Sequence, residues 1–146
     1  MTTAIVYYSK HHGNTKKLLD AIVDSDASVV LIDVTEQPDA DLSVFDRIGF
    51  ASGIYFGAFA KQIISFAEAH LPENKAVFYI YTYGVSAGNV QKEIREIAEK
   101  NHCRELGSYH CLGFDTFGPF KLVGGIAKGH PTAEEIAGAV NFYQAL

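Results

Sequence analysis

The sequence is poor in cysteine, in long apolar stretches and in basic residues. Its two cysteines, Cys103 and Cys111, are too few for a disulfide scaffold or a four-cysteine metal site. No apolar run approaches the roughly 18 residues of a membrane span, and no basic-then-apolar leader opens the chain. We therefore expect a reduced, cytoplasmic protein that does not enter a membrane.

The charge balance bears on the class of partner. Lys and Arg number 12 and Asp and Glu 17, which gives a net charge of −5 and argues against a nucleic-acid surface. The histidines outside the first loop lack the i, i+4 spacing of a helical metal site, so we predict no bound metal. With 146 residues, 48% of them hydrophobic, and no repeat or linker, the chain is predicted to be one domain, 1–146.

Short apolar runs alternate with segments of helical periodicity. The runs predict buried strands at Thr3–Tyr8, 28–34, 47–53, 76–81 and 105–112. Helices are predicted at 15–23, 60–70, 87–101 and 132–146, the last opened by a capping box of Thr132 and Glu135, and a short helix at 38–45. This alternation predicts a three-layer α/β sandwich, with helices on both faces of a parallel sheet. Such sheets bind ligands beyond the carboxyl ends of their strands, where the strand order reverses.

The turn after the first predicted strand has the residues of a phosphate site. It runs Ser9, Lys10, His11, His12, Gly13, Asn14, Thr15 directly into the first predicted helix. A helix N-terminus offers unpaired N–H groups and a partial positive charge, and glycine lets the backbone approach an anion closely. A plain strand-to-helix turn with a Ser, Asn or Thr cap is the alternative. The hydroxyls, the amide and the glycine together favour phosphate.

This turn resembles the phosphate loop of the flavodoxin family, which reads Ser/Thr-x-Thr-Gly-Asn-Thr after the first strand. The chain has Ser9, Gly13, Asn14 and Thr15, with one extra residue and histidines where the family has threonine. Length, element order and loop placement agree over essentially the whole chain, and Gly113 opens a Gly-Phe-Asp-Thr segment found in small flavodoxin-like proteins. The resemblance implies a five-stranded parallel sheet of order 2-1-3-4-5 and FMN as the cofactor.

The resemblance also places the flavin ring against two further loops. After the third predicted strand come Ser52, Gly53, Ile54, Tyr55, Phe56 and Gly57, and after the fourth come Thr82, Tyr83 and Gly84. The aromatic residues among them either stack on the ring or complete the core. In family members with a comparable step, the peptide at the position of Gly57 flips on reduction and presents its carbonyl to the flavin N5–H.

Two other features have open roles. The segment 114–131 holds three phenylalanines and either covers the flavin edge, forms a partner surface or makes a small apolar cluster. Cys111 is the better redox candidate of the two cysteines because its strand points toward the predicted site, although a buried structural thiol is the commoner case.

The resemblance implies an FMN-binding electron carrier that cycles between oxidised, semiquinone and reduced flavin. Its partners would be redox proteins, and it would be a monomer or weak homodimer. The alternatives on the same fold are an FMN-dependent oxidoreductase, such as a quinone reductase or a porphyrinogen-oxidising flavodoxin, and a binding module that has lost flavin. Two other classes with this architecture are excluded. The chain lacks the acidic cluster that a response-regulator receiver needs, and it lacks the Cys-x5-Arg loop of a low-molecular-weight phosphatase.

Overall fold

A computed structural model describes residues 1–9, 13–84, 88–113 and 129–146. Its strands are β1 (Thr3–Tyr8), β2 (Val30–Asp33), β3 (Arg47–Tyr55), β4 (Ala58–Phe59), β5 (Ala76–Tyr83) and β6 (Arg104–Leu112). Its helices are α1 (Asn14–Ser25), α2 (Lys61–His70), α3 (Lys92–Lys100) and α4 (Ala133–Gln144). Within these described ranges, no helix is long and apolar enough to cross a bilayer.

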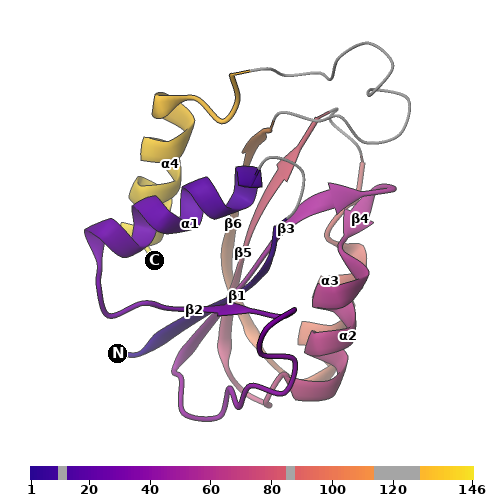
Figure 1. Ribbon diagram of the computed structural model, residues 1–146. Coiled ribbons are helices and arrows are strands. Elements are labelled where there is room, and N and C mark those ends of the chain that lie inside the picture. The colour runs from indigo at the N-terminus through magenta and orange to yellow at the C-terminus, as the bar shows by residue number, and fades with distance from the viewer. Residues whose placement is uncertain (10–12, 85–87, 114–128) are drawn as a thin grey trace.

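The parallel strands lie in the order β2-β1-β3-β5-β6 (Figure 1), which confirms the predicted order of the five long strands. The sheet also contains β4, which the sequence did not predict; this short strand pairs antiparallel with the end of β3. Strand order reverses between β1 and β3, because the chain goes outward to β2 and returns to the other side of β1. The loops that follow β1 and β3 therefore flank the point at which such sheets bind ligands.

Two apolar layers hold the helices on the sheet. Helices α1 and α4 pack side by side on one face, and α2 and α3 cover the other (Figure 1). Phe50 and Tyr79 are fully buried in the layer under α2 and α3, while Ile5 and Phe78 are fully buried in the layer under α1 and α4. Because β1, β3 and β5 are covered on both faces, they are apolar along most of their length instead of alternating.

Two predicted helices differ from the structure. The prediction of a helix at 38–45 is wrong: this segment forms turns, in which the side chain of Asp41 accepts a hydrogen bond from the Ser43 N–H at 2.9 Å. Aspartate side chains that bind the backbone in this way compete with helix formation. The helix predicted at 87–101 begins only at Lys92; residues 88–91 form turns and residue 87 lies outside the described part.

The capping box predicted for the last helix is confirmed. The Thr132 hydroxyl accepts a hydrogen bond from the Glu135 N–H at 3.2 Å, and the Glu135 carboxylate accepts one from the Thr132 N–H at 2.8 Å. These reciprocal bonds satisfy two backbone donors that a helix N-terminus would otherwise leave unpaired. They fix the residue at which α4 begins.

Gly49 provides a test of the core under α1 and α4. It pairs with Ile5 on one side and Phe78 on the other, and a Cβ atom at this position would lie 2.5 Å from the Phe78 ring. We expect Gly49→Ala to lower the free energy of unfolding by about 1–3 kcal/mol, because the buried ring must move. Urea unfolding measures this loss. Combining Gly49→Ala with Phe78→Leu should cost less than the sum of the two single changes, and strict additivity would contradict the contact.

Candidate functional site

The carboxyl edge of the sheet brings together the ends of β1, β3 and β5. In register, Tyr8 lies beside Ser52, and Ser52 beside Tyr81, and the next row contains Gly53, Thr82 and Cys111. Ser9 follows β1 directly, and α1 begins five residues later with Asn14. The three loops that the sequence predicted to form a site therefore start from one edge.

The N-terminus of α1 is suited to an anion. Gly13 occupies the cap position in the left-handed region, with φ of 63°, and has no side chain with which to cap the helix. The first turn of α1 contains no acidic residue, and Lys16 and Lys17 follow at once. The Lys16 N–H donates a long bond of 3.4 Å to the Ser9 hydroxyl, which holds that hydroxyl at the helix start. Backbone donors, the helix dipole and a hydroxyl thus converge where a phosphate would fit.

A buried pair of threonines joins this helix to the centre of the sheet. The hydroxyls of Thr15, in the first turn of α1, and Thr82, near the end of β5, lie 3.0 Å apart. Both side chains are buried. This hydrogen bond fixes the first turn of α1 over β5, so that the helix N-terminus keeps a defined position relative to the loop after β5.

The loop after β3 is a tight β-hairpin. Tyr55 pairs with Ala58, which leaves Phe56 and Gly57 as a two-residue turn, and both have positive φ, 51° and 75°. Positive φ at both positions is the pattern of a type I′ turn. Glycine adopts this conformation freely, but it is a genuine outlier for a bulky residue such as Phe56. Backbone strain of this kind is concentrated at functional sites.

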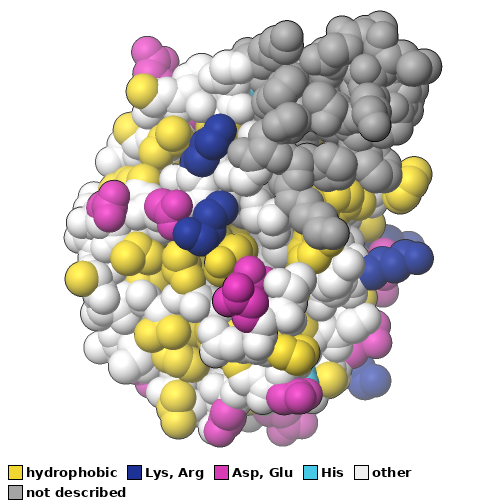
Figure 2. Space-filling view, in the orientation of Figure 1, with side chains coloured by type: hydrophobic (Ala, Val, Ile, Leu, Met, Phe, Trp, Pro, Cys, Tyr) yellow, Lys and Arg dark blue, Asp and Glu magenta, His cyan; other side chains and the backbone are white. Residues whose placement is uncertain are grey.

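Phe56 also departs from the usual placement of apolar side chains, because it is 90% exposed. Apolar side chains project from the surface over the β3–β4 hairpin (Figure 2). Tyr55, by contrast, turns toward the sheet, where its ring meets that of Tyr8 edge-on with the centroids 6.1 Å apart. A groove of about 680 Å³ runs from these two tyrosines along the hairpin to α2.

Tyr83 lies at the other side of the site in a set of aromatic rings. The imidazole of His110, on β6, stacks on Tyr81 at 5.0 Å between centroids and lies 5.6 Å from Tyr83. The Tyr81 hydroxyl in turn accepts a hydrogen bond from the Gln91 amide at 3.2 Å. Tyr83 itself is half-buried at the end of β5.

Ser52 was predicted to bind the cofactor, but its hydroxyl makes hydrogen bonds within the protein. The side chain is completely buried and accepts a hydrogen bond from the Ala60 N–H at 3.0 Å, while it donates to the Gly53 carbonyl. This contact joins the end of β3 to the start of α2. The Ser52 side chain thus holds the hairpin in place, and its neighbours Gly53 and Ile54 belong to the paired part of β3.

The end of β6 closes the site next to Asn14. The Gly113 N–H donates to the Tyr83 carbonyl at 3.0 Å, and a Cβ atom on Gly113 would lie 2.7 Å from the Asn14 amide nitrogen. Only glycine allows this close approach of the β6 backbone to the start of α1. Gly113 was not among the predicted site residues; its position directly after the fifth predicted strand was the available signal.

The structure therefore brings together part of the predicted set. Ser9, Gly13, Asn14 and Thr15 meet Thr82, Tyr83 and Gly84 at one edge, and the hairpin of Tyr55, Phe56 and Gly57 projects beside it. Lys10, His11 and His12 lie outside the described residues, as does nearly all of the segment 114–131. The hairpin itself was missed, because Phe-Gly is not a usual pair for a type I′ turn.

The redox role considered for Cys111 has no support in its surroundings. Its side chain is buried in the apolar layer under α1 and α4, and this burial raises the pKa of the thiol to about 12. Because the thiolate is the reactive form, a buried thiol of this kind is inert at neutral pH. Cys103 is half-buried at the opposite edge of the sheet, and burial raises the pKa of its thiol as well.

Comparison with known proteins agrees with this architecture. An uncharacterized protein of Methanocaldococcus jannaschii is 36% identical over 149 aligned residues, which cover 100% of this chain and 98% of that protein. Oxidised flavodoxin 1 of Bacillus cereus is 11% identical with a TM-score of 0.69, over 99% of each chain. A flavoprotein of Lactobacillus acidophilus, solved in complex with FMN, is 17% identical with a TM-score of 0.58, over 75% of this chain and 92% of that one.

The two structural matches show the shared fold, and a family model adds the sequence relationship. The model of the flavodoxin domain matches residues 5–113, which span β1 to the end of β6 and include the loops after β1, β3 and β5. This match covers most of the chain, so the chain belongs to the flavodoxin domain family.

Proposed function

We propose that this protein is an electron carrier that holds FMN at the carboxyl edge of its sheet. The observation that carries the proposal is the N-terminus of α1, which lies at the strand-order reversal with Gly13 at its cap and no acidic residue in its first turn. Membership of the flavodoxin domain family and the FMN bound by the L. acidophilus flavoprotein support the choice of ligand.

The residues of this edge fit the chemistry of a flavin phosphate. Backbone N–H groups of the first turn of α1 would bind the phosphate oxygens, together with the hydroxyls of Ser9 and Thr15. Lys17 adds positive charge close to this position, whereas the Lys16 ammonium forms an ion pair with Asp20 one turn further along α1. Thr82 would act through Thr15, because its hydroxyl keeps the Thr15 hydroxyl in place.

The flat ring of FMN would be held by aromatic side chains. The half-buried Tyr83 and the exposed Phe56 lie on the two sides of the site, and Tyr55 packs against Tyr8. When bound, FMN supplies the ability to accept and release one or two electrons. The protein's contribution is to orient the ring, exclude water from one face and present backbone groups of the hairpin to its edge.

A carrier and an oxidoreductase on this fold differ in whether a small substrate is turned over. We favour the carrier because neither the loop sequences nor the arrangement of the described loops marks a second nucleotide or porphyrin site. The net charge of −5 favours a basic redox protein as the partner. The strained and exposed Phe56 next to the proposed ring position provides an apolar contact for such a partner.

The phosphate site is tested by comparing FMN with riboflavin, which lacks the phosphate. Thr15→Val removes one hydroxyl with little change of shape, and we expect about a tenfold loss of FMN affinity with riboflavin affinity unchanged. Fluorescence titration of both flavins measures this. Thr3→Val is the matched control, because Thr3 is also buried but lies at the opposite edge of the sheet. Equal affinity of the wild-type protein for the two flavins would contradict the phosphate site.

The carrier function is tested by turnover. The FMN-loaded protein, reduced anaerobically, should pass its electrons stoichiometrically to a basic one-electron acceptor such as cytochrome c. Because the two surfaces attract each other, the transfer rate should fall as the salt concentration rises. With NADH or NADPH and a quinone, the protein alone should not complete repeated cycles. Sustained quinone reduction under these conditions would instead identify an oxidoreductase.

The hairpin turn predicts a role for Gly57 in tuning the flavin. Gly57→Val should resist the positive φ of 75° at this position, because a β-branched residue tolerates it poorly, and so restrict the Phe56–Gly57 peptide. We expect a smaller fraction of one-electron-reduced flavin at the midpoint of an anaerobic reduction followed by absorbance. Gly57→Asn is the control, because asparagine accepts positive φ. The same fraction in all three proteins would rule out this role.

A further inference from the structure

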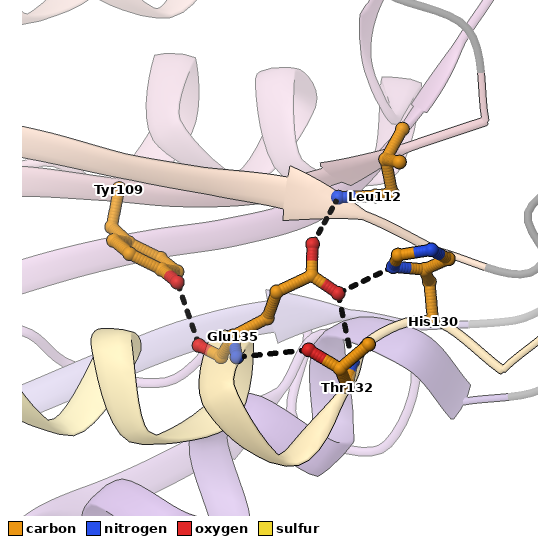
Figure 3. A network of polar contacts seen from close by, with 5 residues as sticks. All are labelled: Tyr109, Leu112, His130, Thr132 and Glu135. Atoms are coloured by element: carbon orange, nitrogen blue, oxygen red, sulfur yellow. Dashed lines mark hydrogen bonds and ion pairs between the residues drawn. The ribbon is translucent and has the colours of Figure 1, made fainter.

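The carboxylate of Glu135, in the first turn of α4, binds more groups than a capping box requires. One oxygen accepts hydrogen bonds from the Thr132 N–H and from the imidazole Nδ1 of His130. The other accepts a hydrogen bond of 3.3 Å from the N–H of Leu112, the last residue of β6 (Figure 3). Partial burial acts to raise the pKa of Glu135, but these hydrogen bonds outweigh it and hold the pKa below its usual value. The group is therefore an ionised acceptor at neutral pH.

These contacts join α4 to the end of β6 at one point. The hydroxyl of Tyr109, on β6, also donates to the backbone carbonyl of Glu135 at 2.6 Å (Figure 3). A Cβ atom on Gly138, one turn further along α4, would lie 2.5 Å from that hydroxyl. The first turn of α4 is thus held against β6 by side chains from both elements, and the Leu112 N–H is bound at the end of the strand.

The end of β6 in turn supports the start of α1. Gly113 follows Leu112, its N–H is bound by the Tyr83 carbonyl, and its backbone lies in close contact with the side chain of Asn14. Asn14 is the first residue of α1 and is only 7% exposed. A displacement of the Leu112–Gly113 backbone would therefore be transmitted to the residue at the helix N-terminus.

We propose that Glu135 and Gly113 are positioning residues that set the selectivity of this protein for a phosphorylated flavin. The Glu135 carboxylate binds the Leu112 N–H, and the Gly113 backbone packs against the Asn14 side chain. Together these contacts orient the first turn of α1 so that its N–H groups face the phosphate. The inference rests on the proposed FMN site. It extends that site to a residue of α4, 120 positions away in the sequence from Thr15, that touches neither the phosphate nor the ring.

The sign of the effect separates positioning from simple electrostatics. Glu135→Gln removes a negative charge from the neighbourhood of the phosphate site, which by Coulomb's law alone strengthens the binding of an anion. Loss of positioning weakens that binding. Glutamine also serves in a capping box, so the start of α4 should survive the change. Glu134→Gln is the matched control: it removes the same charge from the adjacent exposed residue, for which the described residues show no hydrogen bond.

The experiment measures the affinities of FMN and riboflavin for the full chain by fluorescence titration. We expect Glu135→Gln to lower the FMN affinity at least about fivefold and to leave the riboflavin affinity unchanged, while Glu134→Gln changes neither by more than about twofold. An unchanged or increased FMN-to-riboflavin affinity ratio in Glu135→Gln overturns the proposal. A wild-type protein that binds both flavins equally overturns the phosphate site as well, so the two failures are distinguishable.

A second variant tests the contact with Asn14 directly. Gly113→Ala places a Cβ atom 2.7 Å from the Asn14 amide nitrogen and 2.9 Å from its Cγ, so one of the two residues must move. We expect it to lower the same affinity ratio at least about fivefold. In an Asn14→Ala background, which removes both of these atoms, Gly113→Ala should lower the ratio less. Equal losses in the two backgrounds overturn the proposed route through Asn14.

Discussion

The carboxyl ends of parallel strands lie at one edge of the sheet, and every part of the proposed site depends on this constraint. The loop after β1 reaches the edge together with those after β3 and β5 because the three strands are in register there, with Tyr8, Ser52 and Tyr81 in one row. The row above contains Gly53 and Thr82, whose hydroxyl binds Thr15 of α1. Helix α1 is thus attached to β5, which lies two strands away from β1 in the sheet, and not only to the strand from which it emerges.

The two sides of this edge differ in how firmly they are held. The phosphate side includes three buried polar residues, Asn14 and Thr15 in α1 and Thr82 in β5. The hairpin side ends in a two-residue turn in which Phe56 adopts an unfavourable φ while its side chain is 90% exposed. This difference suits a cofactor with two unlike parts. Its phosphate stays the same and can be held by fixed groups, while its ring gains and loses electrons beside the strained turn.

Features that depend on local pattern were predictable from the sequence. Continuous apolar runs identified β1 and β5 because both faces of those strands are buried, and the Thr132–Glu135 pair identified the start of α4. The error at 38–45 was also local, because Asp41 binds the backbone of Ser43 and so favours a turn over a helix. Neither outcome required knowledge of the tertiary structure.

The missed features depend on contacts between distant segments. The β3–β4 hairpin turns at Phe-Gly, and contacts outside the turn, among them those of Ser52 with Ala60 and of Tyr55 with Tyr8, help to hold a turn that phenylalanine disfavours. Gly113 looks like an ordinary glycine at a strand end until the start of α1 is placed against it. In the same way, the capping box predicted that Glu135 would bind Thr132, but not that its second oxygen would bind Leu112.

The position of Glu135 follows from the topology of the fold. Strand β6 is one of the two edge strands of the parallel sheet, and only β5 lies beside it in the described sheet, so its end has fewer neighbours to fix it than the ends of β1 or β3. Its carboxyl end must nevertheless hold a defined place, because Gly113 contacts Asn14 there. Helix α4 packs against α1 and β6 on the same face. An ionised side chain in its first turn is therefore well placed to fix the edge strand, and a charged acceptor makes that hydrogen bond stronger than a neutral one would.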